Sequence, residues 1–188
     1  MNFRLFLETI DLSHIDQDEI IKRAIDNMDW SGGDGEGFRH YAKIDLYGDP
    51  YYDGDDVDEK EVEEKTLEIA KEELQDKLYD IIWQYEQFKD PLRLYREITV
   101  RGDSFEEIIK NIRLLGVGIF WSHSERTAEA HWGRFQPGYR KILLYAEVPA
   151  VSVNWEDTLM MNIQPSMIDE KEIRLREHAQ VIIGGVKP

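Results

Sequence analysis

Three groups of side chains in the second half of the chain have types and spacing suited to chemistry on an anionic substrate. They are Arg96, Ser122 with Ser124, and Glu170 with Glu172. A guanidinium offers five N–H donors in a fixed fork, which suits an anionic ligand. Residues two apart in a strand share a face, so we expect the two carboxylates to project from one side, about 7 Å apart. Carboxylates that close repel each other unless a ligand or a cation uses them.

Each group also has a purely structural interpretation: an arginine in an edge strand, the polar end of a strand, and a pair of surface glutamates. The informative feature is therefore the order of the groups along the chain. Arg96 is flanked by apolar residues, Ser122 follows the aromatic pair Phe120-Trp121, and Ile173 continues the strand after Glu172.

In this order the three groups resemble the motifs of the arginine–serine–glutamate class of ADP-ribosyltransferases, the mono-ADP-ribosylating enzymes of bacterial toxins and phages. The resemblance covers about residues 92–186. The matching segments are Leu-Tyr-Arg96, then Gly118-Ile-Phe-Trp-Ser122-His-Ser124 with Ala128, then Glu170-Lys-Glu172-Ile-Arg-Leu.

The resemblance implies an enzyme that transfers ADP-ribose from NAD, with NAD as its cosubstrate and no metal. It assigns Arg96 to the diphosphate of NAD and Glu172 to the ribose hydroxyls. A carboxylate there stabilises the oxocarbenium-like transition state that forms as the bond to nicotinamide breaks. Ser122 orients Glu172, and Glu170 is associated with acceptors that are arginine side chains, because it helps to activate the incoming nitrogen.

The second motif is also expected to contribute to the cofactor pocket. Trp121, Phe120 or a tyrosine could stack on nicotinamide, although core packing is the more frequent fate of such aromatic residues. Ser124 belongs to the same motif. Two positions differ from the family pattern: Glu97 stands where many members have glycine after the arginine, and His123 is the middle residue of the serine triplet.

Alternative functions remain open at this stage. In an NAD glycohydrolase, water replaces the acceptor. In a different class, a non-catalytic acidic inhibitor mimics nucleic acid and occupies a basic groove on its partner.

The elements that must position these residues follow from periodicity and turn signals. We expect a mixed α+β fold, with an ADP-ribosyltransferase-like split β-sheet core and an N-terminal helical elaboration. Predicted strands cover residues 2–10, 38–47, 92–100, 119–122, 141–148 and 150–153, with a terminal strand pair at 172–175 and 180–183. Predicted helices cover about 18–30, 57–88, a segment capped by Ser104, and 127–132, while 31–37 is predicted as a glycine-rich loop and 49–58 as an acidic loop.

Charge is distributed unevenly along the 188 residues. The net charge is −16, from 39 acidic and 23 basic side chains. Before Pro91 there are 26 acidic and 10 basic residues, and from Pro91 onward there are 13 of each. We therefore expect one domain over 1–188, with an acidic part at 1–91 and a β-rich, NAD-binding catalytic part at 92–188. The acidic part disfavours nucleic-acid binding and suits a protein target with a basic surface.

Composition excludes several other classes of protein. The chain has no cysteine, which removes disulfides, thiolate zinc sites and cysteine nucleophiles. An EF-hand loop starting at Asp53 would need glycine at its sixth position, where Asp58 stands. No apolar run approaches the roughly 20 residues that span a bilayer. These features predict a protein of the cytoplasm without a metal or a membrane partner.

Overall fold

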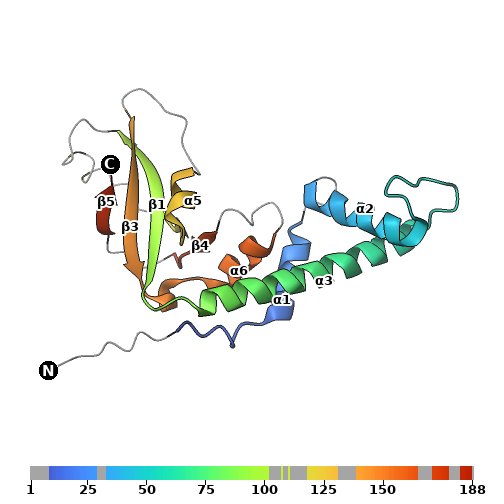
Figure 1. Cartoon of the computed structure of the whole chain (residues 1–188), viewed down its shortest axis with the longest axis horizontal. Helices are drawn as coiled ribbons and strands as arrows, with labels where there is room; N and C mark the ends of the chain where they lie inside the picture. The colour runs from blue at the N-terminus through green and yellow to red at the C-terminus, as the bar shows by residue number, and fades with distance from the viewer. Residues whose placement is uncertain are drawn as a thin grey trace. The chain divides into compact units, whose positions relative to one another are not determined.

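The structure, a computed structural model of the chain, describes residues 9–28, 33–101, 107, 110, 118–130, 139–164, 171–177 and 183–187. Three helices come first: α1 (Gln17–Asp26), α2 (Gly33–Tyr47) and α3 (Glu59–Glu86). The later part contains β1 (Leu92–Arg101), β2 (Phe120–Ser122), α5 (Glu125–Ala130), β3 (Tyr139–Val148), the 3-10 turn η1 (Ala150–Ser152), α6 (Trp155–Ile163), β4 (Glu172–Arg174) and β5 (Ile183–Lys187) (Figure 1). The chain is thus an α+β protein, as predicted.

Contacts divide the chain into two compact units. The first consists of Met1–Ser13, Tyr85–Thr158 and Asp169–Pro188, and the second of His14–Gln84 and Leu159–Ile168. The sequence predicts one domain with a division near residue 91, whereas the chain leaves the sheet-bearing unit after Ser13 and returns to it at Tyr85. All described candidate site residues belong to the first unit.

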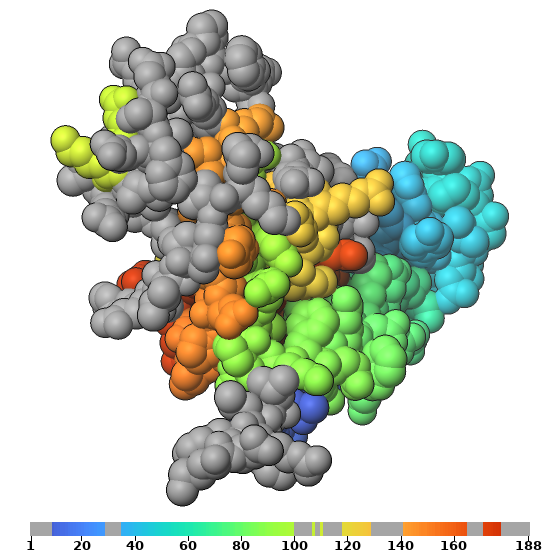
Figure 2. Space-filling view, turned by 60° about the vertical axis from the view of Figure 1, so that its left-hand side comes forward, coloured from blue at the N-terminus to red at the C-terminus, as the bar shows by residue number. Residues whose placement is uncertain are grey.

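The sheet has five strands in the order β4-β2-β1-β3-β5, with every neighbouring pair antiparallel. Its longest ladder joins β1 and β3 from Leu92↔Val148 to Arg101↔Tyr139. One face of this ladder forms a core, because Leu94, Leu144 and Val148 are fully buried. Helix α5 contacts β1 and β2, and Figure 2 shows β1, β3 and α5 packed side by side.

Helix α3 confirms the long amphipathic helix predicted for residues 57–88. Its buried positions recur every four residues, the spacing that keeps side chains on one helix face. They are Val62, Thr66, Ala70, Leu74, Leu78 and Ile82. Asp58 begins the helix by accepting a hydrogen bond from the Lys60 amide at 3.0 Å. Helix α1 begins in a similar way, because the Asp16 carboxylate accepts a hydrogen bond from the Glu19 amide.

Helix α2 corrects two predictions, the strand at 38–47 and the loop at 31–37. Phe38 and Ala42 are buried one helical turn apart, whereas Tyr41 and Ile44 are exposed. Because Tyr41 and Ile44 are apolar although exposed, the apolar residues of this helix alternate in the sequence as they would in a strand. The helix ends at Gly48, whose φ is +76° and whose N–H donates to the Ile44 carbonyl. Glycine adopts this left-handed conformation without steric cost.

Three further predictions need correction. Residues 150–152 form η1 rather than a strand, and Val153 makes an isolated bridge to Leu175. The segment from Trp155 to Ile163, for which the sequence patterns predict no element, is helix α6. The two terminal strands lie at opposite edges of the sheet, because β4 pairs with β2 and β5 pairs with β3. Neighbours in sequence need not be neighbours in a sheet.

Some predictions fall on residues outside the described part. They include most of the N-terminal strand, of which Thr9 bridges Lys89. They also include most of the helix after Ser104, of which Glu107 and Lys110 are described as helical. Among the described helices, none is both long and apolar enough to span a membrane.

Candidate functional site

The strands that carry the three motifs are direct neighbours in the sheet. Strand β2 lies between β1 and β4, and Ser122 is opposite Tyr95 on one side and opposite Glu172 on the other. Side chains of directly opposite residues share a face, with Cβ atoms about 4.5–5.5 Å apart. Ser122 and Glu172 therefore project side by side, although 49 positions separate them in the sequence.

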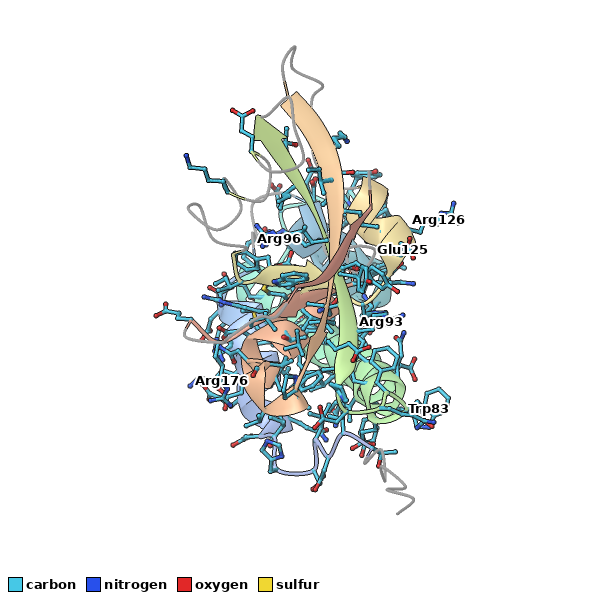
Figure 3. The ribbon with its side chains drawn as sticks, turned by 90° about the vertical axis from the view of Figure 1, so that its left-hand side faces the viewer. Trp83, Arg93, Arg96, Glu125, Arg126 and Arg176 are labelled. Carbon is cyan, nitrogen blue, oxygen red and sulfur yellow. The ribbon has the colours of Figure 1, made fainter. Side chains whose placement is uncertain are left out.

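Arg96 follows Tyr95 on β1, and its guanidinium lies near enough to Glu172 for the two charges to interact. Its Nη1 donates to the Phe120 carbonyl oxygen at 2.5 Å, and the Glu172 carboxylate is close enough to favour the charged guanidinium. Burial has the larger and opposite effect, so the pKa of Arg96 is lowered from its ordinary value. Its Nε is buried and has no hydrogen-bond partner among the described residues. The site thus holds a partly desolvated cation with unused donor capacity. Figure 3 labels the Arg96 side chain.

Gly118 makes room for this guanidinium. A Cβ atom at Gly118 would lie 2.7 Å from both Nη atoms of Arg96, closer than real Cβ contacts. Its φ of +65° also belongs to the left-handed region that favours glycine. The Gly118 carbonyl accepts a hydrogen bond from Trp121 Nε1 at 3.2 Å, which fixes the orientation of this peptide.

The two serines of the second motif have different structural positions. Ser122 is buried, and its Oγ accepts from the Ser124 amide at 3.1 Å. A hydroxyl has one donor and two acceptor positions, so Ser122 can still donate its proton toward Glu172. Ser124 Oγ accepts from the Thr127 amide at 3.2 Å and so caps α5. The family resemblance assigns Ser124 to the cofactor, but here its side chain begins a helix.

The aromatic pair of the second motif also divides between two roles. Trp121 is 2% exposed and lies opposite the fully buried Ile173, so it packs in the core. Phe120 is 43% exposed and lies opposite Arg174, whose Cζ is 5.6 Å from the ring centroid. Of the two, Phe120 has the exposed ring.

Glu97, one of the two positions that differ from the family pattern, has a local structural explanation. Its side chain is 9% exposed and forms an ion pair with Lys141 Nζ at 2.9 Å. Because Lys141 supplies the opposite charge, the Glu97 carboxylate is compensated within the sheet.

His123, the other differing position, contacts the rings of Tyr85 and Phe88, with centroids 5.7 and 5.1 Å away. Burial, reinforced by the nearby positive charge of Lys171, lowers the pKa of His123 to about 4. The imidazole is therefore neutral at pH 7 and belongs to an aromatic cluster.

Glu170 lies outside the described residues, so its expected place beside Glu172 stays a prediction. Sequence reasoning missed Arg174 and its partner Asp157, which bind each other through Nη1 and Oδ2 at 3.0 Å. The signal for Arg174 was present, because it stands two positions after Glu172 and strand alternation puts both on one face. Within the described part of the chain, no group of three or more His, Asp or Glu side chains could hold a metal ion.

Comparison of the chain with protein-family models, with curated proteins and with solved structures found no match.

The space at Gly118 can be tested by the substitution Gly118→Ala. We expect a loss of stability larger than the roughly 1–2 kcal/mol of left-handed backbone strain, because the methyl group also displaces Arg96. Gly48→Ala is the matched control, since Gly48 has positive φ but no atom within 4 Å of the point where a Cβ would lie. Urea unfolding followed by circular dichroism measures both variants.

A double-mutant cycle isolates the contact with Arg96. In an Arg96→Ala background, Gly118→Ala should lower the free energy of unfolding by no more than Gly48→Ala does. An equal cost of Gly118→Ala in both backgrounds would contradict the proposed contact.

The depressed pKa of His123 predicts a pH dependence of stability. The unfolded chain takes up a proton near pH 6.5, whereas folded His123 does so only near pH 4. The neutral His123 therefore makes its full contribution to the free energy of unfolding above pH 6.5. This contribution is lost as pH falls toward 4, by up to about 3 kcal/mol. Denaturant unfolding between pH 7 and 4 should show a shallower loss for His123→Gln than for the wild type. The exposed His14, changed to Gln, is the control, and equal slopes for all three proteins would refute the prediction.

Proposed function

We propose that the protein is an NAD-dependent mono-ADP-ribosyltransferase with an ADP-ribosyltransferase-like split-sheet core. The observation that carries the proposal is the pairing of Ser122 with Glu172 in adjacent strands, next to the guanidinium of Arg96. A chance collection of motifs would have no reason to fall on three neighbouring strands. The order of the strands in space differs from their order in sequence, so this adjacency is independent support.

In the proposed reaction, Arg96 binds the diphosphate of NAD through its unused donors. The bond between the ribose C1′ and the nicotinamide nitrogen breaks, and nicotinamide leaves with the bonding electron pair as a neutral molecule. Positive charge develops on the ribose, where the Glu172 carboxylate stabilises it. The Ser122 hydroxyl holds this carboxylate in place. The acceptor nitrogen then bonds to C1′ and loses a proton.

The favoured acceptor is an arginine side chain of a protein with a basic surface. A guanidinium must lose a proton as it attacks, and Glu170 is the base that the family resemblance assigns to this step. If water attacks instead, the same site gives an NAD glycohydrolase. Both reactions use Arg96, Ser122 and Glu172 in the same roles.

A second candidate function is favoured by the surface of α3. Five exposed carboxylates recur every four residues along this helix: Glu64, Glu68, Glu72, Asp76 and Asp80. Glu64 and Glu68 have Lys60 and Lys65 as ion-pair partners, whereas the other three have none among the described residues. Like charges at this spacing destabilise a helix by about 0.2–0.5 kcal/mol per pair. A basic partner would relieve this repulsion, as expected of a non-catalytic inhibitor that mimics nucleic acid.

Incubation with NAD labelled in its adenylate part, together with cell lysate, tests the leading proposal. We expect label on protein, and we expect Glu172→Gln to reduce it by at least a hundredfold because the stabilising charge is lost. Glu147→Gln is the control, since Glu147 lies on β3 and pairs with Arg93 at the surface. Free ADP-ribose without labelled protein would identify the glycohydrolase. Absence of both products, in wild type and variant alike, would refute the enzymatic proposal.

The acidic surface of α3 is tested with an oligoarginine peptide. Isothermal titration should show binding that weakens steeply as salt is raised. Asp76→Asn with Asp80→Asn should weaken it further, because these exposed carboxylates have no competing ion pair among the described residues. Glu61→Gln with Glu63→Gln, also exposed on α3, is the matched control of equal charge change. Equal weakening by both pairs, or affinity that is insensitive to salt, would argue against a defined docking face.

A further inference from the structure

We propose that Arg174 is a second anion-binding residue of the candidate site and that, with Arg96, it holds the diphosphate of NAD. The inference rests on the proposed function, because NAD is the substrate it concerns. It adds a ligand-binding residue on β4, next to the strand that carries Arg96's hydrogen-bond acceptor.

The register of the sheet places Arg174 beside the Ser122–Glu172 pair. Phe120 is opposite Arg174, just as Ser122 is opposite Glu172. Since side chains alternate along a strand, these four residues share one face, with Arg174 about 7 Å along β4 from Glu172. The guanidinium is therefore on the face where the reaction is proposed to occur.

Two contacts hold the Arg174 side chain in one orientation. Its Cζ lies 5.6 Å from the centroid of the Phe120 ring, and its Nη1 is 3.0 Å from Asp157 Oδ2. Asp157 is itself held by Asn154, whose Nδ2 donates to the same oxygen at 2.8 Å. An arginine fixed by an aromatic ring and a carboxylate loses little entropy when it binds a ligand.

Fixing the side chain does not use up its donors. A guanidinium has five N–H groups, and the contact with Asp157 involves one nitrogen. Among the described residues, Nε and Nη2 of Arg174 have no hydrogen-bond partner, and the side chain is 31% exposed. Asp157 offsets part of the positive charge of Arg174. An anion bound there would therefore be stabilised chiefly by directed hydrogen bonds from the guanidinium.

Both guanidinium groups converge on Phe120. Arg96 donates to its backbone carbonyl, and Arg174 lies against its ring. The carboxylates near them are Asp157, which pairs with Arg174, and Glu172, which faces the ribose in the proposed reaction. A diphosphate presents two adjacent anionic groups, and two separate forks match it better than one.

The test compares Arg174→Gln with Arg93→Gln. Arg93 is a matched control, because it too stacks on an aromatic ring, Tyr145, and pairs with a carboxylate, Glu147, but both of these partners are on β3 rather than on β2 or α6 (Figure 3). Inorganic pyrophosphate and NAD are titrated separately by calorimetry. We expect Arg174→Gln to weaken the binding of pyrophosphate and of NAD by about tenfold or more, because a hydrogen bond to a charged group is lost. The Arg93→Gln variant should bind both ligands with wild-type affinity. The KM for NAD should rise more than kcat falls.

A conservative variant protects the test from a folding defect. Arg174→Lys keeps the charge next to Asp157 but removes the fork, so it should keep the wild-type melting temperature and still weaken pyrophosphate binding. Wild-type affinity for pyrophosphate in both Arg174 variants would overturn the inference while leaving the proposed function intact. Pyrophosphate binding that depends on Arg174, in a protein that does not cleave NAD, would support the anion site and refute the enzyme.

Discussion

The position of β2 between β1 and β4 is the constraint on which the candidate site depends. This strand has three residues, yet its pairing on both sides brings together segments from three separate parts of the sequence. One register fixes Ser122 opposite Glu172 and Phe120 opposite Arg174. A shift by one residue would move every one of these side chains to the other face. Gly118, just before the strand, admits the Arg96 guanidinium and completes the arrangement.

The parts of the fold that sequence predicts well are those governed by local rules. Helices α1 and α3 follow from apolar side chains that recur at helical spacing among charged residues. Strand β1 follows from its apolar residues around Arg96. Helix α2 escaped prediction because its exposed Tyr41 and Ile44 obscure the buried Phe38–Ala42 spacing. Exposure depends on what packs against a helix, which local patterns do not specify.

The candidate site was predicted as a set of residue types rather than as an arrangement. Order along the chain pointed to Arg96, Ser122 and Glu172, but their adjacency depends on strand pairing over long sequence distances. Ser124 and Trp121 have roles in a helix cap and in the core, which the motif spacing could not distinguish from ligand contacts. Arg174 was not among the predicted residues, because its contacts are with Phe120 in another strand and Asp157 in a helix.

The outer side of β4 has a consequence for assembly. At Arg174, the backbone N–H donates to Thr158 Oγ1 at 3.0 Å, and the carbonyl accepts from the Asn154 amide at 2.8 Å. Both main-chain groups that an added strand would need at this position are therefore already used. Natural proteins protect sheet edges in this way against edge-to-edge aggregation. At this point the sheet is closed to extension by another chain.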